Sequence, residues 1–196
     1  MEKIKIIALF GEAGSGKDYL YNKIVHWDEE GVIEPVFNTI VKSTTRPQRE
    51  METDGVDYHF LTVDQFTEAT KQGNMTAISV YRDWMYGIET SELSTKKPNF
   101  VILDLLALGA LTRNPDYDLT IFKISASPKT RLLRQLNREK NPDTDEIIRR
   151  YSADKEEYSR LDFDYIELKN ETQEDADRAM LEIMRAGCAA ALGNSV

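Results

Sequence analysis

Short apolar runs rich in Ile, Val and Phe alternate with longer charged stretches along this chain of 196 residues. Four runs have the length and the branched or aromatic composition of buried strands, namely Ile4–Phe10, Phe100–Leu106, Leu119–Ser125 and Phe163–Leu168. Four other stretches carry the apolar spacing of amphipathic helices, namely Lys17–Glu30, Pro128–Glu139, Asp143–Tyr158 and Glu171–Met184. Because strands that alternate with helices form a parallel sheet covered by helices, the pattern predicts an α/β fold.

The alternation breaks between residues 39 and 90. This segment is rich in Thr, Asp, Gly and Tyr and contains short pieces of alternating polarity, such as VDYHFLTV, so we expect a small, mostly β insertion. Residues 128–150 are dense in arginine and are interrupted by an Asn-Pro pair, which predicts a helical lid. The core then consists of residues 1–38, 91–127 and 151–196. With 41% hydrophobic residues, the chain can bury one core and form one globular domain.

Charge and cysteine content narrow the functional classes. The net charge of −9 disfavours binding to nucleic acids or anionic membranes. The single cysteine, Cys188, excludes a disulfide framework and is typical of a reducing compartment. The apolar N-terminal run is too short for a signal peptide, and no run reaches the ~18 residues of a membrane span. We therefore expect a soluble, cytoplasmic protein, a monomer or a homodimer, without nucleic-acid or membrane partners.

A glycine-rich string, GEAGSGKD, follows the first predicted strand and opens the first predicted helix. This context is the one required of a P-loop, in which backbone N–H groups converge on phosphate oxygens and the lysine reaches the β- and γ-phosphates. The residues predicted to bind a nucleoside triphosphate are Gly11, Glu12, Ala13, Gly14, Ser15, Gly16, Lys17 and Asp18. The alternative is an ordinary glycine-rich turn between a strand and a helix.

Two aspartates stand where a magnesium ion that accompanies the triphosphate can be held. Asp18 takes the place of the hydroxyl residue that usually follows the P-loop lysine. It can serve Mg²⁺ directly or through a water, or it can be a first-turn helix acid without a catalytic role. Asp104 ends the run VILD, at the strand ends where open α/β sheets bind ligands, and it can orient the ion or its waters. The alternative for Asp104 is a solubilising residue at a strand end.

A second motif, STTRPQREMETDGVDYHF, lies in the predicted insertion. Arg46 and Arg49 flank Pro47, which holds the segment extended or turned. Two guanidinium groups at this spacing can converge on one phosphate, each with a bidentate fork, and the Tyr58 hydroxyl can join them. Two phosphate sites in one domain indicate phosphoryl transfer. Taken singly, these residues would be a solvated basic turn and a strand tyrosine.

The whole second motif resembles the acceptor-nucleotide module of guanylate kinases, and other motifs follow in that family's order. These are the P-loop at Gly11, Tyr86-Gly87, VILD at Val101 to Asp104, the pair Arg134 and Arg138, Ile147 to Glu157, and Phe163 to Asn170. The resemblance implies a P-loop kinase fold with a monophosphate-binding insertion and a lid. It also implies an enzyme that uses Mg²⁺ and transfers the γ-phosphoryl group of ATP to a nucleoside monophosphate, by default GMP or dGMP.

The resemblance further implies roles for single residues. The acceptor monophosphate would be held by Arg46, Arg49, Tyr58 and Tyr86, and Lys42, which departs from the family pattern, is a further candidate for binding the acceptor. The catalytic residues would be Lys17, Arg134 and Arg150 around the transferred phosphoryl group, with Arg46 on the acceptor phosphate. Arg138 and Asn170 would lie near the adenosine of ATP. Because helical arginines are usually solvated charges, only the matching order of the motifs supports these roles.

The base-recognition positions depart from the family pattern. Lys42, Ala77, Ile88 and Leu106 stand where guanylate kinases have, in turn, a hydroxyl, an acid, a hydroxyl and an acid. Lys42 can donate to a carbonyl of the base or point to solvent. If the alignment shifts by one residue around Ala77, the base would be read by Ser79, Tyr81, Arg82 or Asp83.

Two alternatives to a GMP or dGMP kinase therefore remain. One is a kinase for a different or modified deoxynucleoside monophosphate. The other is a non-catalytic, guanylate-kinase-like module that binds a phosphorylated partner. A P-loop ATPase that acts on nucleic acid fits poorly with a net charge of −9.

Overall fold

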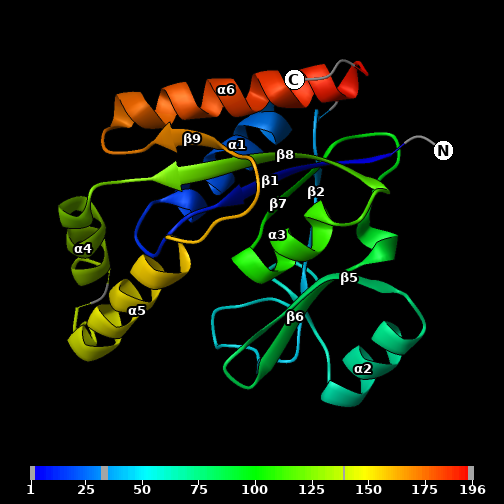
Figure 1. Cartoon of the computed structure of the whole chain (residues 1–196), viewed down its shortest axis with the longest axis horizontal. Coiled ribbons are helices and arrows are strands. Elements are labelled where there is room, and N and C mark those ends of the chain that lie inside the picture. Colours follow the sequence, from blue (N-terminus) through cyan, green and yellow to red (C-terminus); the bar gives the residue numbers. More distant parts are fainter. Residues whose placement is uncertain (1–2, 32–34, 139, 194–196) are drawn as a thin grey trace.

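The computed structural model describes residues 3–31, 35–138 and 140–193 and confirms the α/β prediction. Five parallel strands form the central sheet in the order β2, β7, β1, β8, β9 (Figure 1). The strands are β1 (Ile4–Phe10), β2 (Asn38–Thr39), β7 (Asn99–Ile102), β8 (Tyr117–Ser125) and β9 (Ile166–Lys169). Because β1 lies in the middle, the glycine-rich string after it emerges at the centre of the sheet's carboxyl edge, where such sheets bind ligands.

Alternate residues of β1 enter two apolar cores on opposite faces of the sheet. Ile7 and Leu9 pack against α1 (Lys17–Gly31) and α6 (Gln173–Ala191). On the other face, Ile6 and Ala8 lie in a core shared with α3 (Leu105–Thr112) and the insertion. Burial on both faces explains why this strand is a continuous apolar run.

One predicted strand ends earlier than its apolar run. We expected a strand over Phe100–Leu106, but β7 ends at Ile102 and Leu105 begins α3. The Asp104 carboxylate caps this helix by accepting a hydrogen bond from the Ala107 N–H at 2.9 Å. A short apolar run does not distinguish a buried strand from a buried helix, so the prediction was wrong at this boundary.

The insertion forms a mixed sheet of its own, in the order β4, β3, β6, β5. Its strands are β3 (Ser43–Thr44), β4 (His59–Phe60), β5 (Met75–Tyr81) and β6 (Trp84–Glu89). It also contains α2 (Val63–Lys71), which we did not predict. Thr62 and Gln65 form a capping box at the start of α2, and Phe66 is its buried anchor. A short 3₁₀ helix, η1 (Thr90–Glu92), leads back to the central sheet.

The arginine-dense region forms two helices, α4 (Pro128–Leu136) and α5 (Thr144–Glu157). They lie beside the carboxyl end of β8, on the same edge of the sheet as the loop after β1 (Figure 1). The predicted end of the first of these helices, at Glu139, lies outside the described residues. In the described part of the chain, no helix is long and apolar enough to cross a bilayer.

Candidate active site

The glycine-rich string forms the expected loop between β1 and α1, which begins at Lys17. Gly14 has a φ of +79°, a left-handed conformation that glycine adopts without strain. A Cβ atom at Gly14 would lie 2.5 Å from the carbonyl oxygen of Arg131, so α4 packs directly against this loop. The strand–loop–helix arrangement that a phosphate-binding loop requires is therefore present.

A cleft of about 790 Å³ joins the P-loop to the insertion. Lys17 and Asp18 line it on the side of the P-loop, and Lys42, Tyr58 and Tyr86 line it on the side of the insertion. The structure therefore brings Tyr58 of the second motif to the same cavity as the P-loop, whereas Arg46 and Arg49 are not among the residues that line it.

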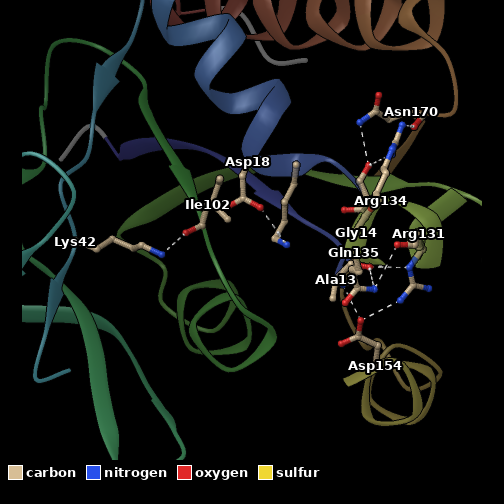
Figure 2. Close-up of polar contacts among 12 residues, drawn as sticks. Ala13, Gly14, Asp18, Lys42, Ile102, Arg131, Arg134, Gln135, Asp154 and Asn170 are labelled. Atoms are coloured by element: carbon tan, nitrogen blue, oxygen red, sulfur yellow. Dashed lines mark hydrogen bonds and ion pairs between the residues drawn. The ribbon is translucent and has the colours of Figure 1, made fainter. Parts of the chain in front are cut away.

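Lys17 and Asp18 form an ion pair at the cleft, with 3.6 Å between Nζ and Oδ2 (Figure 2). The Asp18 side chain is 77% exposed, so it is accessible to a magnesium ion or one of its waters. Asp104 is more engaged, because its Oδ2 accepts a hydrogen bond from the Ser79 hydroxyl at 2.5 Å while its Oδ1 caps α3. Among the residues described, no group of three or more His, Cys, Asp or Glu is arranged to hold a metal ion.

Arg46 is buried beside two aromatic rings, at 5.5 Å from the centroid of Tyr58 and 5.8 Å from that of Phe60. It donates to the Glu52 carboxylate at 2.6 Å, and this hydrogen bond lowers the pKa of Glu52. Arg49 is 69% exposed and lies 4.0 Å from the same carboxylate. The Glu52 carboxylate therefore lies within ion-pair distance of both arginines. The sequence analysis did not single out Glu52, although an acid three residues after Arg49 was an available signal.

Lys42, Tyr58 and Tyr86 complete the insertion's side of the cleft. The Lys42 ammonium donates to the carbonyl oxygen of Ile102 at 2.9 Å and lies 5.7 Å from the Tyr58 ring centroid (Figure 2). Burial lowers the pKa of Lys42, and the Asp104 carboxylate partly offsets this effect. The rings of Tyr58 and Tyr86 meet edge to face, 6.1 Å apart, and burial raises the pKa of both phenols. Both hydroxyls are therefore hydrogen-bond donors at neutral pH.

The other positions considered for base recognition have different surroundings. Ala77 and Ile88 are buried in the core beneath the insertion. Leu106 is 65% exposed and lines the cleft. Arg82, at the tip of the β5–β6 hairpin, lies 2.6 Å from the Glu146 carboxylate of α5. The tip of the hairpin thus contacts α5, while Val80, Tyr81 and Tyr86 of the same hairpin line the cleft.

The structure separates the residues that we grouped around the donor phosphates. Arg150 lines the cleft. Arg134 donates to the backbone carbonyls of Ser15 at 3.0 Å and Asn170 at 2.7 Å (Figure 2). Asn170 is buried, and its side-chain amide also donates to the Ser15 carbonyl, at 2.9 Å. Arg138 is exposed just beyond the end of α4. Arg134 and Asn170 therefore contact the backbone of the P-loop.

Two residues that the sequence analysis missed also hold the P-loop. The buried Arg131 of α4 donates to the Ala13 carbonyl at 3.1 Å, and Asp154 of α5 accepts from the Ala13 N–H at 2.7 Å. Arg131 and Asp154 are themselves 3.0 Å apart. The density of arginines does not indicate which arginine faces the loop, and the motif from Ile147 to Glu157 contains Asp154 without indicating its contact with Ala13.

Comparison with known proteins agrees with this geometry. The family model for guanylate kinase matches residues 3–187. The guanylate kinase of Thermotoga maritima is 30% identical over 188 residues, which covers 94% of this chain and 87% of the relative. That of Syntrophotalea carbinolica is 31% identical over 195 residues, again with 94% and 87% covered.

A crystal structure of guanylate kinase from Anaplasma phagocytophilum shares the fold, with a TM-score of 0.66 and 17% identity over 95% of this chain and 88% of that one. The family model and the relatives of 30% and 31% identity extend over nearly the whole chain. This chain therefore belongs to the guanylate kinase family.

Proposed function

We propose that this protein is a nucleoside monophosphate kinase that transfers the γ-phosphoryl group of ATP to GMP or dGMP. The observation that carries the proposal is one cleft lined both by Lys17 of the P-loop and by Tyr58 and Tyr86 of the insertion. Phosphoryl transfer requires donor and acceptor phosphates held in line more than covalent help from the protein. Membership of the guanylate kinase family supports both ATP as the donor and a guanine nucleotide as the acceptor.

In this proposal residues 39–90 hold the acceptor, with Arg46 and Arg49 on its phosphate. Lys17 and Arg150 stabilise the negative charge on the group in transfer. No general base is needed, because the acceptor phosphate is already anionic near neutral pH. Residues 128–150 act as a lid that excludes water and so suppresses hydrolysis of ATP.

Asp18 is the residue best suited to hold the magnesium ion that accompanies ATP, because its carboxylate is exposed beside Lys17. Asp104 would act through a water, since both of its oxygens already accept hydrogen bonds. Bound Mg²⁺ would neutralise part of the charge on the donor phosphates.

A different or modified deoxynucleoside monophosphate is the second candidate acceptor. Lys42 is compatible with such an acceptor, because its half-buried ammonium at the cleft presents donors to any base with a carbonyl group, guanine included. Ala77 is buried and Leu106 is apolar, so neither can accept hydrogen bonds from guanine nitrogens. A site without such acceptors discriminates weakly against other bases.

The test is ADP production from Mg-ATP with a panel of ribo- and deoxynucleoside monophosphates, including modified pyrimidines. Lys17→Ala should abolish turnover without unfolding the protein, whereas Lys71→Ala, on an exposed face of α2, should leave it unchanged. A preference for GMP or dGMP supports the first acceptor, and a preference for another base supports the second. Absence of turnover with every acceptor, in a protein that still binds nucleotides, would identify a non-catalytic binding module.

A further inference from the structure

The backbone carbonyls of the P-loop are bound on one side by side chains. The Ala13 carbonyl accepts from Arg131 at 3.1 Å and from Gln135 at 3.4 Å. The next two carbonyls, of Gly14 and Ser15, accept from Arg134 at 3.4 and 3.0 Å. All three donor side chains belong to α4, so this helix lies along the carbonyl side of the loop (Figure 2).

This arrangement determines the direction of the loop amides. In a trans peptide unit the C=O and the following N–H point in opposite directions. Because the carbonyls of Ala13 and Ser15 point to α4, the N–H groups of Gly14 and Gly16 point away from it. Backbone N–H groups directed to the same side are what a phosphate-binding loop needs.

Side chains bind both backbone polar groups of Ala13. Its carbonyl is bound by Arg131 of α4, and its N–H donates at 2.7 Å to Asp154 of α5. The two side chains are joined to each other at 3.0 Å, and Arg131 is also 3.4 Å from Glu12. Arg131 is 6% exposed, so these partners replace most of its contact with water. Tyr151 closes the site, with its ring centroid 5.2 Å from the guanidinium.

We propose that Arg131 and Asp154 form a clamp on Ala13 that positions the P-loop amides for the donor phosphates. They are positioning residues, because they act through the loop backbone rather than by touching the transferred group. Arg134 also positions the loop, since its guanidinium donates hydrogen bonds to the backbone carbonyls of Ser15 and Asn170. The inference rests on the proposed function only in taking ATP as the donor.

The clamp also links the P-loop to both lid helices. Arg131 comes from α4 and Asp154 from α5, and the two side chains contact both Ala13 and each other. Loss of either side chain leaves the other charge buried beside a peptide group that has lost a partner. The two residues should therefore behave as one unit.

The experiment measures the dissociation constant of ATP by titration calorimetry with the full chain, together with KM for the acceptor. The variants are Asp154→Asn, Arg131→Lys and the two combined. Glu156→Gln, an exposed acid on the same helix as Asp154, is the matched control. Thermal unfolding followed by circular dichroism establishes that each variant is folded.

We expect each single variant to weaken ATP binding about tenfold, because a small misplacement of binding groups has effects of this order or larger. The double variant should bind only slightly less tightly than the weaker single variant, since the residues act as a unit. The KM of the acceptor should change less than about twofold in each variant. In the control, Glu156→Gln, the dissociation constant of ATP should also change less than about twofold.

ATP binding within about twofold of the original chain in both folded single variants would overturn the clamp. An equal rise in the KM of the acceptor would also overturn it, because that result indicates general loosening of the structure. If Arg131→Lys does not fold, Asp154→Asn alone decides. Since ATP binding needs no acceptor, a chain that binds ATP but transfers no phosphoryl group refutes the proposed function and leaves the clamp testable.

Discussion

Replacing Gly14 by alanine tests how tightly α4 packs against the P-loop. Gly14 has a φ of +79°, and Gly73, after α2, has a φ of +75°. Alanine at either position incurs the same left-handed strain, about 1–2 kcal/mol. At Gly73 a Cβ atom would meet nothing within 4 Å, whereas at Gly14 it would lie 2.5 Å from the Arg131 carbonyl oxygen and 3.0 Å from its Cα.

The contact at Gly14 is with backbone, so it cannot be relieved by rotating a side chain. Overpacking of this kind costs about 1–3 kcal/mol. We therefore expect Gly14→Ala to lower the free energy of unfolding by about 2–5 kcal/mol and Gly73→Ala by about 1–2 kcal/mol. Urea unfolding followed by circular dichroism measures both values, and their difference isolates the contact with α4.

ATP binding supplies the second readout. Relief of the contact at Gly14 requires α4 to move away from the loop and carry Arg131 and Arg134 with it, so Gly14→Ala should weaken ATP binding, and Gly73→Ala should not. Equal losses of stability in the two variants would refute the reasoning, because they would mean that the loop and α4 can separate at no cost.

Three further predictions concern stability. Phe100→Ala should cost about 3–5 kcal/mol in urea unfolding, because this ring is fully buried and stacks on Phe37 at 4.7 Å; a loss below about 1 kcal/mol would contradict this packing. Thr172→Ala should cost about 0.5–2 kcal/mol by removing the capping box of α6, measured in the same way, and Thr172→Ser should restore most of it. Hydrogen bonds from Arg149 and then Arg150 lower the pKa of Glu146 from 4.5 to about 2. The contribution of the ionised Glu146 carboxylate to stability is therefore complete above pH 4.5 and is lost as the pH falls toward 2. Glu146→Gln should thus flatten the fall in stability with decreasing pH, measured by urea unfolding at several pH values. An unchanged pH dependence would show that the hydrogen bonds of Glu146 with Arg149 and Arg150 add no stability.

The sequence indicated the central sheet and the P-loop, because both depend on local features. β1 is apolar throughout since both of its faces are buried, and a glycine-rich string with a lysine between a strand and a helix has few other uses. The arginine pair in the insertion was predictable for the same reason, because its spacing around a proline is local. The roles assigned to Arg46 and Arg49 remain predictions until acceptor binding is measured.

Where the local sequence pattern fitted both a strand and a helix, the prediction was wrong or an element was not predicted. The run that ends β7 continues apolar into α3, and the capping hydrogen bond of Asp104 separates the two elements. α2 is a nine-residue helix inside a segment of strand-like composition, and packing of Phe66 beneath the insertion sheet stabilises it. Tertiary burial decides such short elements, because their intrinsic preference is weak.

By itself, then, the sequence determined an α/β fold and the strand–loop–helix context of the glycine-rich string, and it predicted two phosphate-binding motifs, since each of these depends on neighbouring residues. Only the tertiary structure decided which side chains meet. Asp154 lies 141 residues from Ala13 and 23 from Arg131 along the chain, so no local sequence pattern predicts that these three residues contact one another. The same holds for Lys42, whose ammonium meets the Ile102 carbonyl 60 residues away. Such contacts exist only after two parts of the chain have been packed together, because their free energy comes from burial and geometry that neither part has alone.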